Sequence, residues 1–415
     1  MGNISQIRKI AADEHGAVKE FFLNLLRFPS LPGKEQDAID FIDDCFSPLC
    51  DRIERVSFPD NFTADPEYSF PVEGIDYTGR CNLRCIWNAD SPGPSLVINA
   101  HVDVVPPSKG QLSAFDPQVN DGIVFARGAC DDKGQIAALY LLLKILSQLP
   151  TRPEVKLILH LVVEEENGGN GTLAMVRAGE KADAAIVLEP TSNRIIPSVR
   201  GAVWFRVTTQ GKACHSGQAG RGASALDRAL DVKTALEGYH RHLLDNSKGI
   251  PLFDQFPNPM PLTFGKLHAG DWPAMVPDCA VLEGVLGFLP NRNRHQVMAE
   301  ISDCVRNTAS SHEDQARIEF MYRHDCHVLD MSHPLIEILK ESITDCGQEP
   351  VISAMPASCD SWYYNNLMGI PSVVIGAGDL AHAHTSNEQI RLEDISLLAC
   401  ELACLLHRFP ASFKQ

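Results

Sequence analysis

The spacing of apolar residues changes along the chain and indicates different elements in different parts. Between Ala11 and Arg55, apolar positions such as Phe21 and Leu25 recur every three to four residues, which predicts helices. Short β-branched and aliphatic runs follow, separated by helical stretches. The run Leu157–Val163 is almost continuously apolar, as expected of a strand buried on both faces of a sheet.

The order of these runs predicts an α/β fold with a mostly parallel central sheet, because strands that alternate with helices form βαβ units. In the first half of the chain, the expected strands cover residues 95–105, 155–163 and 184–188, and the expected helices cover 135–149 and 173–178. Similar elements return near the end of the chain, with a helix at 334–346, a strand at 371–375 and a helix at 392–407.

The middle of the chain has a different element order, β-α-β-β-α-β, which is typical of the ferredoxin-like unit. Its expected strands are 203–209, 262–268, 280–288 and 316–323, and its expected helices are 223–244 and 294–308. We therefore predict one α/β domain formed by residues 1–198 and 325–415, interrupted by an inserted α+β domain at 199–324.

Charge and composition exclude several classes of protein. The chain has 415 residues and a net charge of −17, and such an acidic surface repels nucleic acids and anionic membranes. The sequence shows no apolar run of roughly 20 residues and no N-terminal signal region, so we expect no membrane span. The 13 cysteines follow no repeating spacing, which favours reduced thiols and a cytoplasmic location.

Candidate metal-ligating side chains follow several predicted strands, where ligands bind in open α/β sheets. Histidine and carboxylate side chains together are typical ligands of divalent metals. Four groups follow strands and a fifth residue begins a helix; they are His101 with Asp103, Glu164–Glu166, Glu189, His382 with His384, and Asp131.

Each of these groups also has a purely structural interpretation. His101 alone would more often be a hydrogen-bonded core histidine, Asp131 a helix N-cap, and Glu164–Glu166 a solvated run of charge. However, charges directly after a buried strand are costly unless they are paired or bound to a metal. Five such coincidences at one sheet edge favour a metal site.

With these residues identified, the sequence resembles the acetylornithine deacetylase and succinyl-diaminopimelate desuccinylase family of dinuclear zinc hydrolases. The superfamily of this group also contains aminoacylases, carboxypeptidases and dipeptidases, and its catalytic domain has a zinc-peptidase-like fold. Six motifs carry the resemblance in the family's order: His101–Pro106, Arg127–Gly134, Glu164–Glu166, Leu188–Thr191, Gly211–His215 and His384–Glu388.

The resemblance implies two zinc ions per chain, for which cobalt or manganese could substitute. His101, Asp131 and Glu189 would hold one ion. Asp131 would bridge to the second ion, held also by Glu166 and His384.

The resemblance also implies three further catalytic roles. Asp103 would orient His101, and Glu165 would be the general base for a water between the metals. His215 would reach the partner subunit's site and stabilise the oxyanion, because the inserted domain is the usual dimerisation surface of the family. We therefore expect a homodimer.

Two departures from the family pattern concern substrate binding. Ala274 and Gly287 occupy positions where relatives often carry Asn and Arg. In those relatives the arginine binds a carboxylate group of the substrate. The first hypothesis is a deacylase of small N-acyl amino acids. The second is a dipeptidase or carboxypeptidase of the same superfamily, and the third is a non-catalytic binding protein on this fold.

Overall fold

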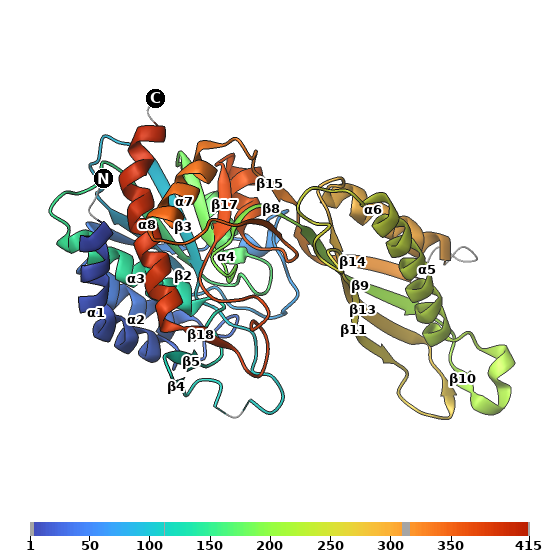
Figure 1. Cartoon of the computed structure of the whole chain (residues 1–415). Helices are drawn as coiled ribbons and strands as arrows, with labels where there is room; N and C mark the ends of the chain where they lie inside the picture. Colours follow the sequence, from blue (N-terminus) through green and yellow to red (C-terminus); the bar gives the residue numbers. More distant parts are fainter. Residues whose placement is uncertain (1–3, 112, 309–315, 414–415) are drawn as a thin grey trace.

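The computed structural model describes residues 4–111, 113–308 and 316–413. A large α/β unit carries both ends of the chain, and a smaller α+β unit projects from one side of it (Figure 1). The helices are α1 (Ile4–Leu25), α2 (Gln36–Phe46), α3 (Lys133–Gln148), α4 (Asn170–Arg177), α5 (Ala225–Asn246), α6 (Arg294–Thr308), α7 (Pro334–Asp345) and α8 (Leu392–Ser412).

The central sheet has nine strands in the order β1-β2-β6-β3-β7-β17-β8-β15, with β16 paired to β8. Its middle strands β6, β3, β7 and β17 run parallel, which confirms the predicted α/β class. The strands are β1 (Arg52–Ser57), β2 (Cys81–Trp87), β3 (Ser95–His101), β6 (Lys156–Val162), β7 (Ala184–Leu188), β8 (Ile195–Val199), β15 (His327–Val328), β16 (Ile352–Met355) and β17 (Ser372–Ile375). A separate three-stranded sheet contains β4 (Gln118–Asn120), β5 (Ile123–Phe125) and β18 (Gln389–Arg391).

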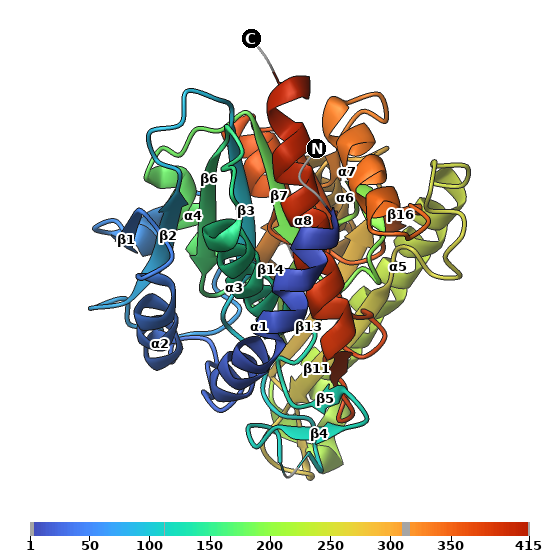
Figure 2. The same cartoon turned by 60° about the vertical axis from the view of Figure 1, so that its left-hand side comes forward.

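Both faces of the central sheet are buried, which explains the continuous apolar runs. Leu96 and Ile98 of β3 pack into the main core, together with residues of α1, α3, α7 and α8. The intervening Val97 faces a second core, which includes Tyr364 and Ile370. Figure 2 shows α1, α3 and α8 side by side over one face of the sheet.

The smaller unit has the predicted order β9-α5-β11-β13-α6-β14, and its antiparallel sheet is ordered β11-β13-β9-β14. The chain enters this unit directly after β8 and returns to the central sheet at β15, as an insertion requires. The exact domain boundaries at 199 and 324 remain a proposal. Its strands are β9 (Gly201–Gln210), β11 (Leu262–Ala269), β13 (Cys279–Phe288) and β14 (Ala316–His324), with a small ribbon of β10 (Cys214–His215) and β12 (Met275–Val276).

Several local predictions were wrong. The helical region does not extend to Arg55, because α2 ends at Phe46 and β1 follows as an edge strand. β1 contains only exposed and half-buried residues, so it lacks the apolar run of an inner strand. The strand expected over 95–105 ends at His101, which leaves Asp103 in the following loop. The prediction missed strands β2, β8, β15 and β16 of the central sheet, the three-stranded sheet of β4, β5 and β18, and the ribbon of β10 and β12.

Helix α8 qualifies the expectation that no segment resembles a membrane span. By length and composition alone, Leu392–Ser412 is long and apolar enough to cross a membrane. In the structure, α8 packs against α1, α3 and α7, and most of its apolar residues lie in the main core. Its composition therefore matches that of a buried core helix.

Candidate active site

The carboxyl ends of the parallel strands bring the predicted ligands to one edge of the central sheet. His101 is the last residue of β3, and Glu165 and Glu166 follow β6. Glu189 follows β7 directly, and His384 lies in the loop between β17 and β18. The side chain of His384 is about half exposed, so the edge is open to solvent there.

A first group of possible ligand atoms surrounds His101. One ligand atom from each of His101, Glu165 and Glu189 lies within 4.8 Å of the other two. His101 Nε2 also lies 2.9 Å from Asp131 Oδ1. Among the described residues, His101 is therefore grouped with Glu165 and Glu189 or with Asp131 and Asp132, and the predicted set of His101, Asp131 and Glu189 is not itself one of the groups.

A second group combines Asp131, Glu166 and His384. His384 Nε2 lies 3.0 Å from Glu166 Oε1 and 3.3 Å from Asp131 Oδ2. Asp131 thus presents one carboxylate oxygen to His101 and the other to His384, which is the arrangement that a bridging carboxylate needs.

Asp103 organises both sides of the first group. Its two carboxylate oxygens accept hydrogen bonds from the backbone N–H groups of Glu165 and Glu166, each at 3.0 Å. Its Oδ1 lies 3.4 Å from His101 Nδ1, and its carbonyl oxygen lies 3.1 Å from the same nitrogen. Asp103 therefore orients the imidazole and the glutamate turn together.

Sequence reasoning gave no role to Asp132, although it is next to Asp131. The backbone N–H of His101 donates to Asp132 Oδ2 at 3.0 Å, and Asp132 can join His101 and Asp131 in a ligand group. Among the described residues, no hydrogen-bond partner reaches its buried Oδ1. Its position inside the Arg127–Gly134 motif was the available signal.

Glu388 was also missed, although it is the last residue of the family motif His384–Glu388. Its Oε1 accepts from the backbone N–H groups of Cys130 and Asp131, both at 3.2 Å. Its other oxygen forms a buried ion pair with Arg127. Glu388 therefore fixes the loop that presents Asp131, across a separation of more than 250 residues along the chain.

Burial and the proximity of several charged groups shift the pKa values of the residues in this cluster. Burial and the nearby carboxylates raise the pKa of Glu189, and burial and Asp360 raise that of Glu165. Burial would lower the pKa of His384, but Glu166 and Asp131 raise it to about 11. Such a concentration of buried carboxylate oxygens and imidazoles fits divalent cations such as zinc, cobalt or manganese, whose charge offsets this repulsion.

His215 lies far from this cluster in the same chain. It belongs to the β10–β12 ribbon, where it pairs with Met275, and its side chain is exposed. Figure 1 shows β10 at the outer end of the smaller unit. The structure therefore does not bring His215 together with the other predicted site residues of its own chain.

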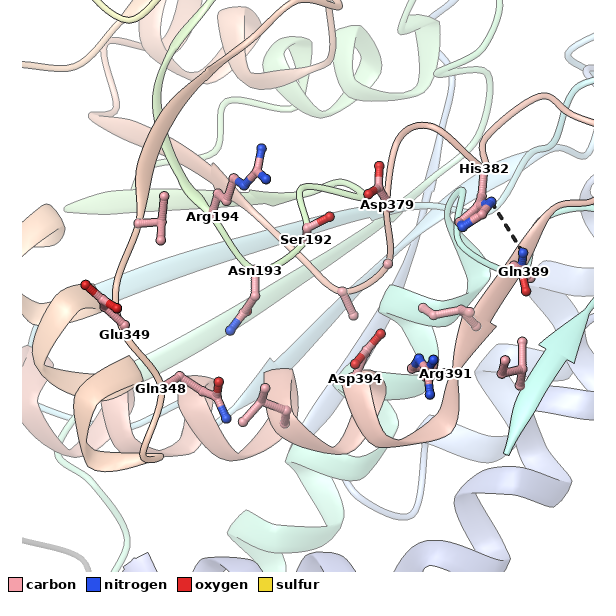
Figure 3. A pocket seen from close by; sticks show the side chains of 16 residues that line it. Ser192, Asn193, Arg194, Gln348, Glu349, Asp379, His382, Gln389, Arg391 and Asp394 are labelled. Atoms are coloured by element: carbon pink, nitrogen blue, oxygen red, sulfur yellow. Dashed lines mark hydrogen bonds between the residues drawn. The ribbon is translucent and has the colours of Figure 1, made fainter. Parts of the chain in front are cut away.

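A cavity of about 590 Å³ is lined in part by the two segments next to Glu189 and His384 in the chain (Figure 3). One wall is the turn at residues 192–194, shortly after Glu189, and another is the stretch 377–382 that leads to His384. Its charged lining includes Arg194 and Arg391, and Figure 3 shows His382 bonded to Gln389. The predicted metal ligands themselves do not line it.

With the site described, comparison with known proteins defines its class. Residues 97–408 match the model of peptidase family M20/M25/M40, and the chain belongs to this family. It is 29% identical over 336 residues to an N-formyl-4-amino-5-aminomethyl-2-methylpyrimidine deformylase of Bacillus subtilis, covering 72% of this chain and 76% of the relative. It is 31% identical over 193 residues to succinyl-diaminopimelate desuccinylase 2 of Ruegeria, covering 43% and 48% of the two chains.

Solved structures agree on the fold. An M20 metallo-carboxypeptidase from Sulfolobus solfataricus superposes with a TM-score of 0.75 at 17% identity, over 95% of this chain and 99% of that one. A dipeptidase from Saccharomyces cerevisiae gives a TM-score of 0.80 at 13% identity, with both chains fully covered. The predicted family resemblance is therefore confirmed, and the chain is a hydrolase of amide bonds.

Proposed function

We propose that this protein is a dinuclear zinc N-deacylase of small N-acyl amino acids, similar to acetylornithine deacetylase. The observation that carries the proposal is the position of Asp131 between two ligand groups, with Glu165 in the same cluster. Relatives named deformylase and desuccinylase favour the removal of an acyl group from an amine over peptide cleavage.

In this proposal, His101, Asp131 and Glu189 hold one zinc ion, and Asp131, Glu166 and His384 hold the other. Cobalt or manganese could replace zinc at such oxygen and nitrogen ligands. When bound, the metals supply Lewis acidity that lowers the pKa of a water molecule and stabilises negative charge on the substrate oxygen.

Glu165 acts as the general base. Its side chain lies in the first ligand group, and Asp103 accepts a hydrogen bond from its backbone N–H. It takes a proton from the attacking water and passes it to the leaving nitrogen. Burial raises the pKa of Glu165, with a further contribution from Asp360, and a raised pKa favours this uptake of a proton.

We also propose a homodimer formed through the smaller unit, with His215 reaching the partner's site. Strand β11 lies at an edge of its sheet, and most of its side chains are exposed. The neighbouring Trp272 is 70% exposed, and Leu267 of β11 is 41% exposed. Exposed edge strands and apolar side chains are features of association surfaces.

A cytoplasmic location fits the state of the cysteines. All 13 cysteines are free thiols, some of them partly exposed, as expected in a reducing compartment.

The proposal is tested by metal content per chain together with a substrate panel. The panel contains N-acetyl, N-formyl and N-succinyl amino acids, an N-formyl aminomethylpyrimidine, and dipeptides. Two zinc ions per chain and cleavage of the acyl amino acids are expected. Absence of metal and of turnover, even with added zinc or cobalt, would contradict the proposal.

A dipeptidase or carboxypeptidase is the second candidate. A probable carboxypeptidase of Uncinocarpus reesii is 24% identical over 76% of this chain and 70% of its own length. Two bound metals with preferential cleavage of dipeptides would support this candidate and exclude the deacylase.

A further inference from the structure

Glu164 is the first residue of the turn that carries Glu165 and Glu166, but it belongs to neither of the two ligand groups. Its side chain is fully buried, and its backbone φ of 62° lies in the left-handed region that residues other than glycine seldom adopt. Such a backbone conformation persists only where the surrounding contacts fix it. The contacts of Glu164 therefore bear on the two side chains that follow it.

The carboxylate of Glu164 accepts hydrogen bonds from four side chains. Arg80 Nη1 donates to its Oε1 at 2.5 Å, and the hydroxyl of Tyr77 donates to its Oε2 at 2.9 Å. The same Oε2 accepts from the side-chain amides of Asn167 and Asn170, at 3.1 Å and 3.0 Å. A buried carboxylate with four donors is held firmly, because moving it would leave buried polar groups without partners.

Arg80 connects this carboxylate to the N-terminal part of the chain. Its Nη2 donates to Glu35 Oε2 at 2.6 Å while its Nη1 contacts Glu164, so one buried guanidinium joins two buried carboxylates. Glu35 is fixed in turn, because its Oε1 accepts from the backbone N–H of Gly33 at 3.1 Å. The guanidinium presents its donors in fixed directions, which the single ammonium group of a lysine does not.

Two carboxylates therefore hold the turn from different sides. Asp103 accepts hydrogen bonds from the backbone N–H groups of Glu165 and Glu166. The side chain of Glu164 fastens the start of the turn to the arginine. A displacement of Glu164 would change the directions in which the next two side chains leave the backbone.

We propose that Arg80 and Glu164 are positioning residues of the reaction. Their ion pair holds the left-handed backbone at Glu164 and thereby directs Glu165 and Glu166 to their separate places in the site. This inference rests on the proposed function, in which Glu165 is the general base and Glu166 is a ligand of the second metal. Arg80 acts only through Glu164, without contact with the substrate.

The test is Arg80→Lys, which keeps the positive charge but cannot hold both carboxylates in the same geometry. We expect kcat to fall about tenfold, because a small displacement of a reacting group slows the reaction strongly, with KM changed less than about twofold. The visible absorption spectrum of the cobalt-loaded protein gives a second readout. Its bands should change in Arg80→Lys, because Glu166 is a metal ligand in the proposed function.

The matched control is Arg84→Lys. Arg84 lies on β2, and it also joins two carboxylates, Glu54 at 2.9 Å and Glu180 at 2.8 Å, neither of which belongs to the site. This variant should keep wild-type kcat and the wild-type cobalt spectrum, even if its melting temperature falls. The comparison separates a positioning role from the general loss of an ion pair.

If Arg80→Lys does not fold, Tyr77→Phe weakens the same contact set more gently. It removes one donor to Glu164 and keeps the aromatic ring. We expect kcat and the cobalt spectrum to change in the same directions as for Arg80→Lys, by smaller amounts. Tyr239→Phe is the control for this variant, because it removes a tyrosine hydroxyl bonded to Glu300 in the smaller unit.

Wild-type kcat in a folded Arg80→Lys variant would overturn the inference, and so would an unchanged cobalt spectrum. Equal losses of kcat in Arg80→Lys and Arg84→Lys would also overturn it. Glu165→Gln separates these failures from that of the proposed function. If Glu165→Gln is inactive while Arg80→Lys behaves as wild type, only the positioning role is wrong. If Glu165→Gln is fully active, the proposed function itself is wrong.

Discussion

At the residue scale, Asp131 and Glu165 occupy the same cluster but have separable roles. Asp131 contacts both histidines of the two ligand groups, whereas Glu165 is proposed as a proton carrier. Glu165→Ala should therefore keep both metals and lose nearly all turnover, a loss of about 100-fold or more. Asp131→Ala should lose metal as well as activity. Elemental analysis and initial rates of the two variants measure this difference, and near-normal turnover of Glu165→Ala would contradict the assignment of the base.

Glu401 is a buried carboxylate outside the site, and it makes stability depend on pH. Its side chain accepts a hydrogen bond from Asn193 at 2.7 Å, and burial raises its pKa from 4.5 to about 8. Between these two values, the folded protein keeps a proton that the unfolded chain has lost. The contribution of Glu401 to stability is therefore greatest below pH 4.5 and falls as the pH rises to about 8.

Glu401→Gln should remove this loss of stability. We expect similar free energies of unfolding for the wild type and the variant at pH 5, and a gain of up to about 4 kcal/mol for the variant at pH 8 to 9. Urea unfolding at both pH values measures the difference. Glu393→Gln, an exposed position on the same helix, is the control and should show no such gain. An equal gain for Glu401→Gln at both pH values would contradict the explanation.

At the scale of elements, the close approach of α4 to β6 positions the glutamate turn between them. Gly171 lies in the first turn of α4, and a Cβ there would lie 2.0 Å from the carbonyl oxygen of Val163. The backbone of Val163 cannot yield without moving Glu164–Glu166. Glycine is therefore required at this position by packing.

Gly171→Ala should destabilise the fold by about 2–3 kcal/mol through overpacking and reduce the metal content. Gly16→Ala is the matched control, because Gly16 lies within α1 and its Cβ would meet nothing within 4 Å. That substitution should stabilise the protein by about 0.5–1 kcal/mol through higher helix propensity. Thermal unfolding and metal analysis of the two variants test the contrast, and equal stability of both would refute the packing argument.

At the scale of the whole molecule, His215 lies in the β10–β12 ribbon at the outer end of the smaller unit, apart from the ligand groups of its own chain. If the proposed dimer shares its sites, inactive Glu165→Ala and His215→Ala chains should complement each other when mixed. A mixed dimer has one site with a wild-type Glu165 and a wild-type His215 from the partner.

Random exchange of subunits makes half of the dimers mixed, so the mixture should recover up to about a quarter of wild-type activity per site, as expected for an isologous dimer. Rates after subunit exchange measure this, with each variant alone as the control. Complete absence of recovery in confirmed mixed dimers would argue against a shared site.

Sequence-based predictions were accurate for features that depend on residues close together in the chain. They missed contacts between residues that are far apart in the chain. The convergence of His101, Glu166 and Glu189 could be expected, because the carboxyl ends of parallel strands meet at one sheet edge. The edge strand β1 was missed because solvent on one side leaves no continuous apolar run. The Arg127–Glu388 pair joins residues 261 positions apart, and no local pattern indicates it.

The sequence by itself determined the fold class, the hydrolase family and the candidate ligands. It did so through the spacing of apolar residues, the residue types that follow each strand and the order of the motifs, all of which can be read along the chain. Only the tertiary structure decided which candidate ligands lie within reach of one another and that Asp132 is among them. It also placed His215 outside the site of its own chain. Such contacts depend on how distant segments pack, and packing is a property of the whole folded chain.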